Sequence, residues 1–330
     1  MGVKNWGKII PWRWTSIDEI DPRIMAFDTP NYLSRRLSVI RPKRIDRVPM
    51  THAHIFMSTV LSCLRNHILP VFVFDGPPER LKRRANHKLV MSAELLYKQW
   101  RDSTDLDALQ PHLESFLSPA MRLYFAMFHI KDICSAAGLP VVAAPSEAEM
   151  AAAVLSQERK VGTVVSNDAD ALLFGATHVT RSIRLSKGEI ERALLSDFTQ
   201  KLELDLHQMR DLAVICGCDF HKQGVHGIGP HKGAIGLKRH GGLEPFLRAL
   251  GRSPTDIQAY LKARDVFEEG GFINLGVQSL ALQPPVVGRV ERLLEEAMGS
   301  ELAEKRATEI LRLWKDFGRV QMTLEGWISQ

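Results

Sequence analysis

Short apolar runs alternate with helical stretches through the first half of the chain. Each run has the length and the apolar content of a buried parallel strand. The runs cover residues 23–27, 71–74, 140–143 and 161–165. Strands that alternate with helices form parallel sheets, so this pattern predicts an α/β fold with a mostly parallel central sheet flanked by helices.

Two stretches between these runs carry clear helical periodicity, at 53–67 and at 120–137. The second is preceded by Ser118 and Pro119 and is followed by Gly138. Serine at the N-cap, proline in the first turn and glycine after the last turn are favoured at helix ends. The sequence therefore predicts both helices and the bounds of the second one.

The pattern changes twice further along the chain. Between Arg80 and Leu117 it becomes polar, charged and only loosely amphipathic, which predicts a helical insertion. Beyond Asp205 the strand signals fade, and helical stretches follow to about Phe317. We therefore expect a first core part at 1–79, an insertion at 80–117, a second core part at 118–260, C-terminal helices at 261–317 and a flexible tail at 318–330.

Composition and charge add a hint about the partner. The chain of 330 residues has 45% hydrophobic and 25% charged residues, which is ordinary for a globular protein and excludes wholesale disorder. Its formal charge of +5 includes two dense basic stretches, which suit a polyanion, although either one alone is also explained as a solvated surface. The first holds Arg35, Arg36, Arg41, Lys43, Arg44 and Arg47, and the second holds Arg80, Lys82, Arg83, Arg84 and Lys88.

The spacing of Cys63, Cys134, Cys216 and Cys218 fits no two-pair zinc pattern. We expect buried free thiols in a reducing compartment. The N-terminus has no apolar signal region, and no window approaches the run of about 20 apolar residues needed to cross a bilayer. These features predict a cytoplasmic protein, or a nuclear one in a eukaryote, with no membrane partner.

Carboxylates follow the predicted strands. In open α/β sheets, ligands bind outside the carboxyl ends of the strands, so acids placed there share one rim. One further acid ends an apolar helix that begins near His207. The set comprises Asp28, Asp75, Glu147, Glu149, Asp168, Asp170 and Asp219.

Each acid alone also has a purely structural explanation. Ser146 and Glu149 could form a capping box, Asp168 and Asp170 could stabilise a turn, and Asp28 could cap the following helix. Seven converging acids differ, because they raise one another's pKa unless cations neutralise them. Hard oxygen ligands favour Mg²⁺ or Mn²⁺, and two such ions about 3.5–4 Å apart serve an in-line phosphoryl displacement.

The acids lie in a series of recognisable motifs. These are Met-Gly-Val at the start, Phe-Asp28, Val-Phe-Val-Phe-Asp75-Gly-Pro-Pro, Ala-Pro-Ser-Glu147-Ala-Glu149, Asn-Asp168-Ala-Asp170-Ala-Leu-Leu-Phe-Gly, and Gly-Cys-Asp219-Phe followed by Gly227-Ile-Gly229-Pro. In this order they resemble the flap endonuclease branch of the XPG family of structure-specific nucleases, most in the style of its archaeal members. The resemblance spans nearly the whole chain. It implies a PIN-like or resolvase-like core, an arch at 80–117 and a DNA-binding helix-three-turn-helix at about 219–240.

The resemblance also implies roles for the acids and for two other residues. Two Mg²⁺ ions per subunit are expected, with Mn²⁺ as a substitute. Lys82 matches the basic residue that approaches the scissile phosphate. Gly2 lies where a residue without a side chain permits close approach of the DNA. Asp28, Asp75, Glu147 and Glu149 serve the first ion, and Glu149, Asp168, Asp170 and Asp219 serve the second.

The glycine turn has a physical explanation of its own. Gly227 and Gly229 let backbone amides face outward at a helix N-terminus, which is a cradle for phosphate, although the same motif could simply start a helix. The family implies that this element grips the duplex, often with a K⁺ ion. Further expected DNA contacts are Lys232, Arg44, Arg83, Arg84 and Lys88.

The end of the chain resembles the peptide by which replication proteins bind the sliding clamp PCNA. Gln321 is followed by Leu324, Trp327 and Ile328, which are the expected glutamine, aliphatic residue and two bulky residues. Ile328 stands where the family prefers an aromatic residue, which predicts a reduced clamp affinity. The alternative is a small amphipathic helix folded back on the body of the protein.

Three departures from the family pattern do not touch the acids. Ser34 stands where a tyrosine stacks on a base, and Tyr32 is the nearest substitute. Leu89 stands where a second basic residue is expected, and His231 replaces a lysine of the glycine turn. These changes concern the catalytic rate and the threading of the single strand.

These observations predict a monomeric 5′ flap endonuclease with accessory 5′-3′ exonuclease activity, acting on branched DNA in replication and repair. One alternative is a 5′-3′ exonuclease or a junction-cleaving enzyme of the same family. Two others are a branched-DNA binder without catalysis, recruited to the clamp, and a ribonuclease built on a PIN-type sheet.

Overall fold

The computed structural model describes residues 3, 6–40, 44–76, 87–102, 106–168, 170–271 and 273–328. Their strands form a seven-stranded sheet in the order β1-β7-β6-β5-β2-β3-β4. β5 pairs in parallel with β2 and with β6, whereas β7 pairs antiparallel with β6 and with β1. The strands are β1 (Arg13–Ser16), β2 (Ile24–Asp28), β3 (Leu69–Phe74), β4 (Val141–Ala143), β5 (Thr163–Val165), β6 (His178–Arg184) and β7 (Glu189–Leu194).

The predicted α/β fold with a mostly parallel sheet is confirmed, and the four predicted strands are β2, β3, β4 and β5. The sequence did not predict β1, β6 and β7. These three strands pair antiparallel at one side of the sheet, and β1 is largely exposed. Strands with a solvated face lack the continuous apolar runs by which buried parallel strands are recognised.

Both predicted helices form, as α2 and α4. The Ser118 hydroxyl accepts a hydrogen bond from the amide of Met121, Pro119 is the first residue of α4, and Gly138 ends the helix in the left-handed region at φ 70°. The described helices are α1 (Thr29–Leu37), α2 (Thr51–Arg65), α3 (His87–Asp102), α4 (Pro119–Ala137), α5 (Ala148–Gln157), α6 (Asp170–Leu173), α7 (Leu195–Leu202), α8 (Leu206–Cys216), α9 (Pro230–His240), α10 (Leu243–Ala249), α11 (Pro254–Gly270), α12 (Val287–Met298) and α13 (Ser300–Ile328), with the 3₁₀ helices η1 (Trp6–Lys8), η2 (Ile17–Glu19), η3 (Leu106–Leu117) and η4 (Leu185–Lys187).

The chain divides into two compact units that alternate along the sequence. One takes residues from 1–28, 75–84 and 143–277, and the other from 29–74, 85–142 and 278–330. The core parts expected at 1–79 and 118–260 therefore each contribute to both units.

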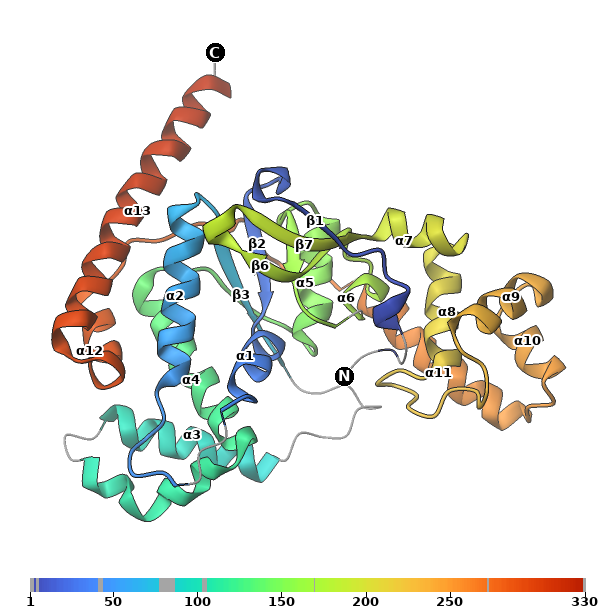
Figure 1. Cartoon of the computed structure of the whole chain (residues 1–330), viewed down its shortest axis with the longest axis horizontal. Helices are drawn as coiled ribbons and strands as arrows, with labels where there is room; N and C mark the ends of the chain where they lie inside the picture. Colours follow the sequence, from blue (N-terminus) through green and yellow to red (C-terminus); the bar gives the residue numbers. More distant parts are fainter. Residues whose placement is uncertain are drawn as a thin grey trace. The chain divides into compact units, whose positions relative to one another are not determined.

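The first unit contains β1, β2 and β5 to β7 with helices α5 to α11. Helix α8 packs against α9 and α11, and α9 packs against α10, as Figure 1 shows. The ring of Phe267 on α11 lies 5.2 Å from that of Phe174 and 4.9 Å from that of Phe220. These apolar contacts fix α11 beside α8 and the end of α6.

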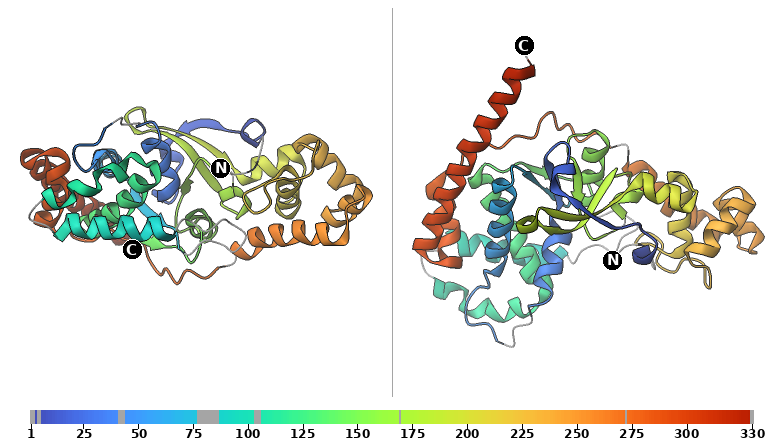
Figure 2. Two further views of the ribbon diagram at one scale, coloured as in Figure 1. Left: turned by 90° about the horizontal axis from the view of Figure 1, so that it is seen from below. Right: turned by 45° about the horizontal axis from the view of Figure 1, so that its top comes forward.

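The second unit contains the described part of the insertion. Helices α3 and η3 pack against α4, and the packing is apolar, which confirms the predicted helical insertion. Helix α12 folds back against α13 in the same unit (Figure 2). Buried residues of the insertion and its supports include Ala93, Leu96, Tyr97, Trp100, Leu113, Phe116 and Phe125.

Helix α13 extends to Ile328, beyond Phe317, where the sequence predicted the helices to end. The predicted burial of the four cysteines is confirmed. Within the residues that the structure describes, no helix combines the length and the apolar character of a membrane span.

Candidate functional site

The pairing of β2 with β5 brings the first acids together. The two strands run in parallel with Phe27 opposite Val165, so both end at the same edge of the sheet. Asp28 is the last residue of β2 and is only 5% exposed. Its Oδ2 accepts a hydrogen bond of 3.1 Å from the hydroxyl of Ser166, which directly follows β5.

Hydrogen bonds also connect Ser166 to two more acids, Asp168 and Asp170. Its hydroxyl accepts a hydrogen bond of 3.1 Å from the amide of Asp168, and Oδ1 of Asp168 accepts one of 3.3 Å from the amide of Asp170. Asp170 is the first residue of α6 and is fully buried. Asp168 therefore stabilises the turn through one of its carboxylate oxygens, as the structural explanation suggested, and both acids are buried.

Asp219 lies near the same acids. Burial raises the pKa of Asp168, the amide of Asp170 lowers it, and the charge of Asp219 raises it further. Burial likewise raises the pKa of the Cys218 thiol to about 12, with a further increase from the charges of Asp170 and Asp219. The charge of Asp219 thus acts on Asp168, and the charges of Asp170 and Asp219 both act on Cys218.

The three remaining acids gather at the N-terminus of α5. Oδ1 of Asp75 accepts a hydrogen bond of 2.8 Å from the amide of Ala148, the first residue of α5. Glu147 is the N-cap residue, and Glu149 in the first turn is 7% exposed. Asp75 therefore caps α5 from a distant part of the sequence. The capping box considered for Ser146 and Glu149 would have given the same role to a neighbouring residue.

Gly76 permits this arrangement. Its amide donates a hydrogen bond of 2.6 Å to the carbonyl of Ser146. A Cβ atom at Gly76 would lie 2.2 Å from the carbonyl oxygen of Ala144. Only glycine allows the segment after β3 to approach the start of α5 so closely.

Helix α5 packs against β2, β5 and α6, so the two groups of acids occupy neighbouring elements. The candidate metal-ligating atoms are all carboxylate oxygens, which suit a hard cation such as Mg²⁺ or Mn²⁺. Among the described residues, no three His, Cys, Asp or Glu side chains are close enough together to hold a metal ion. Within the described part of the chain, the structure therefore places the acids on neighbouring elements but does not gather them into the one cluster that the sequence predicted. Carboxylates repel one another at short range, so drawing the acids closer together would cost free energy that a bound cation offsets.

The glycine turn lies between α8 and α9. Gly227 has φ 75°, in the left-handed region, and Gly229 is the N-cap of α9. Lys232 in the first turn of α9 is exposed. Asp219 does not end α8, because the helix stops at Cys216 and Asp219 lies in the turn closed by Cys218 and His221.

Other predicted site residues are only partly placed. Lys88 on α3 and Arg44 are exposed. Residues 321–328, the predicted clamp peptide, lie in the last turns of α13, and the structure does not describe their side chains. Gly2, Lys82, Arg83 and Arg84 lie outside the described residues.

Sequence reasoning overlooked Ser166 and the burial of Tyr32. Ser166 stands two residues before Asp168, directly after a predicted strand, and that position was the available signal. Tyr32 is 4% exposed, its hydroxyl is hydrogen-bonded with Thr59, and the Arg36 guanidinium lies 3.6 Å from its ring centre. In this conformation the ring has no open face on which a base could stack.

Comparisons with known proteins agree with this geometry. The model of the XPG N-terminal domain matches residues 1–94, and that of the XPG I-region matches residues 138–219. Flap endonuclease 1 of Methanocaldococcus jannaschii is 30% identical over 342 residues, with 100% of both chains covered. Flap endonuclease 1 of Pyrococcus furiosus is 26% identical, also over 100% of both chains.

Solved structures share the fold. The flap endonuclease-1 structure from Methanococcus jannaschii superposes with a TM-score of 0.69 at 25% identity, covering 94% of this chain and 99% of that one. The catalytic core of Rad2 in complex with DNA gives a TM-score of 0.66 at 19% identity, covering 94% and 100%. The family models, the full-length relatives and the shared fold lead to one conclusion: the chain belongs to the flap endonuclease group of the XPG nuclease family.

Proposed function

We propose that the protein hydrolyses DNA at 5′ flaps as a structure-specific endonuclease, with accessory 5′-3′ exonuclease activity, in replication and repair. The observation that carries the proposal is the buried series of Asp28, Ser166, Asp168 and Asp170, which follows the carboxyl ends of β2 and β5. Strand ends of this kind are where open α/β sheets bind their ligands.

Hydrolysis of a phosphodiester requires a nucleophilic oxygen in line with the leaving oxygen and relief of the charge that grows on the phosphate. Divalent cations supply both when they are bound. The buried carboxylates have the donor chemistry for Mg²⁺, with Mn²⁺ as a substitute. Asp28, Asp75, Glu147 and Glu149 would hold one ion, and Glu149, Asp168, Asp170 and Asp219 the other.

The surrounding residues would bind and orient the DNA. The turn at Gly227 and Gly229 leads into the N-terminus of α9, whose amides would bind a phosphate of the duplex, where a K⁺ ion also fits the family pattern. Exposed Lys232, Arg44 and Lys88 add positive charge. Lys82 stabilises the charge of the transition state, and Gly2 gives the DNA close access, with Arg83 and Arg84 as further phosphate contacts.

The partners follow from the same proposal. The enzyme acts as a monomer on branched DNA that carries a 5′ flap. It binds the sliding clamp PCNA through residues 321–328, which place Gln321, Leu324, Trp327 and Ile328 at the end of the chain.

The test is a cleavage assay with the purified full chain and a labelled double-flap duplex, with and without Mg²⁺. We expect cleavage at the base of the flap only with Mg²⁺. A nicked duplex, a blunt duplex and a four-way junction in parallel separate flap cleavage from exonuclease and junction activity. Binding of the flap duplex without any cleavage in Mg²⁺ or Mn²⁺ would refute the proposal.

A further inference from the structure

A buried arginine on α8 holds the end of the helix that begins with Asp170. Arg210 is 7% exposed, and its Nε donates a hydrogen bond of 2.8 Å to the carbonyl of Leu173. Leu173 is the last residue of α6 and Asp170 is the first. The contact therefore joins α8, the helix before the glycine turn, to the short helix that carries one of the seven acids.

The hydrogen bonds of α6 show what Arg210 contributes. The backbone amide of residue 174 donates to the carbonyl of Asp170, that of residue 175 to the carbonyl of Leu172, and that of residue 176 to the carbonyl of Ala171. The carbonyl of Leu173 accepts its hydrogen bond from the guanidinium instead. Arg210 thus acts as the C-terminal cap of α6, a role that backbone or solvent usually fills.

A helix this short depends on such a tether. Four residues make one turn, about 6 Å long, and an isolated turn is not stable by itself. At its other end the amide of Asp170 bonds to Oδ1 of Asp168, so α6 is held at both ends by side chains. Leu173 and Asp170 therefore belong to a single turn that side chains hold at both ends.

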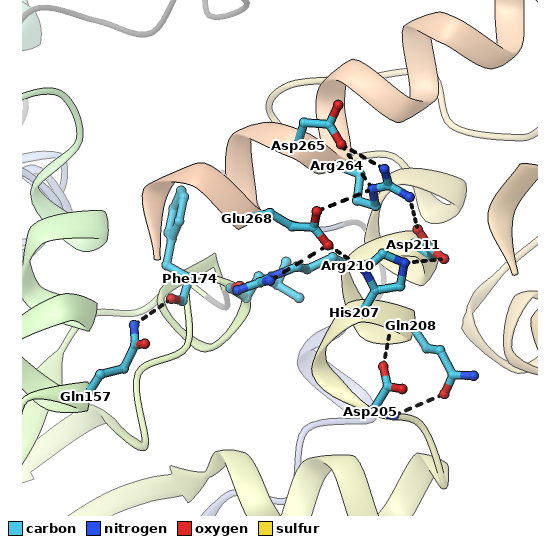
Figure 3. A network of polar contacts seen from close by, with 11 residues as sticks. Gln157, Phe174, Asp205, His207, Gln208, Arg210, Asp211, Arg264, Asp265 and Glu268 are labelled. Carbon is cyan, nitrogen blue, oxygen red and sulfur yellow. Dashed lines mark hydrogen bonds and ion pairs between the residues drawn. The ribbon is translucent and has the colours of Figure 1, made fainter. Parts of the chain in front are cut away.

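The surroundings keep the guanidinium in place, as Figure 3 shows. Nη1 of Arg210 lies 4.0 Å from Oε1 of Glu268 on α11, and Glu268 also bonds to His207 on α8. Gly271 lies beside the group, because a Cβ atom there would lie 3.0 Å from the carbonyl oxygen of Phe174 and 3.4 Å from Nη2 of Arg210. Beside this contact, Gln157 on α5 donates a hydrogen bond of 2.9 Å to the carbonyl of Phe174.

We propose that Arg210 is a positioning residue that holds α6 so that Asp170 can bind a divalent cation, and that it couples α8, the helix before the glycine turn, to the acids. The inference rests on the proposed function, since it assigns Asp170 to the cation. Arg210 touches none of the reacting groups and acts through α6 alone.

The test compares three variants of the full chain. Arg210→Met removes the donor, and Arg210→Gln keeps a polar group that is too short to reach Leu173. Arg264→Met is the matched control, because Arg264 belongs to the same network through Asp265 and Asp211 without bonding to α6. Each protein is titrated with Mn²⁺ by calorimetry without DNA, and amide hydrogen exchange is measured over residues 174–176.

We expect both Arg210 variants to bind Mn²⁺ about 10- to 100-fold more weakly, the usual effect of losing an outer support of a metal ligand. Their amides at 174–176 should exchange faster, whereas Arg264→Met should match the wild type in both measurements. If Arg210→Met does not fold, the Mn²⁺ affinity and the amide exchange of Arg210→Gln alone test the inference.

Wild-type Mn²⁺ affinity in a folded Arg210 variant would overturn the inference, as would an equal loss of affinity in Arg264→Met. The failure of the proposed function is distinguishable. In that case the wild type itself would neither bind Mn²⁺ nor cut the double-flap duplex.

Discussion

At the scale of single residues, the positions of Asp28, Asp168 and Asp170 at the ends of buried strands could be predicted from the sequence because each follows an apolar run, whereas their role as metal ligands stays a prediction. The side chains that arrange them were harder to find. Ser166 bonds to Asp28 across 138 residues of sequence, and no local pattern marks that partnership. Asp75 caps α5 from 73 residues away, so its role depends on the fold of the chain.

Asp168 allows a direct test of the acid cluster. We expect Asp168→Ala to abolish cleavage of the flap duplex, because the substitution removes a carboxylate proposed to hold a cation, while flap binding in Ca²⁺ stays largely intact. Single-turnover cleavage and fluorescence anisotropy measure the two effects. Asp18→Ala, at an exposed acid bonded to Arg23, is the control. Normal turnover of Asp168→Ala in Mg²⁺ would refute the assignment.

Gly76→Ala tests the close approach beside Asp75. A Cβ atom would meet the carbonyl oxygen of Ala144 at 2.2 Å, and backbone cannot move aside as a flexible side chain does. We expect a loss of about 1–3 kcal/mol in the free energy of unfolding, measured by urea denaturation, together with slower cleavage. Gly288→Ala on α12 is the control, because its Cβ would meet nothing within 4 Å. Equal stability of the two variants would contradict the argument.

At the scale of elements, the buried strands and the capped helix α4 were predictable, since apolar runs and cap residues are local signals. Strands β1, β6 and β7 were not, because their outward faces carry polar residues and arginines. The extension of α13 past Phe317 was also missed. Residues 318–328 include polar side chains and Gly326, which sequence rules associate with a tail.

A histidine pair joins three helices of the second unit. Nε2 of His52 on α2 lies 2.7 Å from Nδ1 of His129 on α4, and Nε2 of His129 donates a hydrogen bond of 2.8 Å to the carbonyl of Leu293 on α12. Both side chains are almost fully buried. Burial lowers the pKa of His129 to about 4 and that of His52 well below its usual value, with a further decrease from the charge of His129.

This pair predicts a pH-dependent stability. The unfolded chain binds protons at these sites below pH 6.5, whereas folded His129 binds one only near pH 4, so stability is full above pH 6.5 and falls between pH 6.5 and pH 4. For His129 the loss is on the order of 2 kcal/mol at pH 5. Urea midpoints at pH 7.5 and pH 5 measure it. The double variant His52→Gln with His129→Gln should lose less between these pH values, and an equal loss would exclude the pair as the cause.

At the scale of the whole molecule, the full-length agreement with relatives shows the family, whereas the clamp peptide is a prediction from sequence. We expect the full chain to bind PCNA and a chain that ends at Val320 not to bind it, because the truncation removes Gln321, Leu324, Trp327 and Ile328. Surface plasmon resonance on immobilised clamp measures the difference. Flap cleavage without the clamp should be equal for the two chains, and equal clamp binding would dismiss the peptide.

The long separation in sequence between Asp28 and Ser166 also determines when, during synthesis, the protein can begin to cut DNA. A ribosome that has made Asp28 must add another 138 residues before the partner serine exists. At usual rates of synthesis this takes roughly 7 to 28 s, and Asp219 follows later still. A nascent chain, or one terminated before Asp219, therefore lacks the complete set of acids, so cutting activity arises only after most of the polypeptide has been translated.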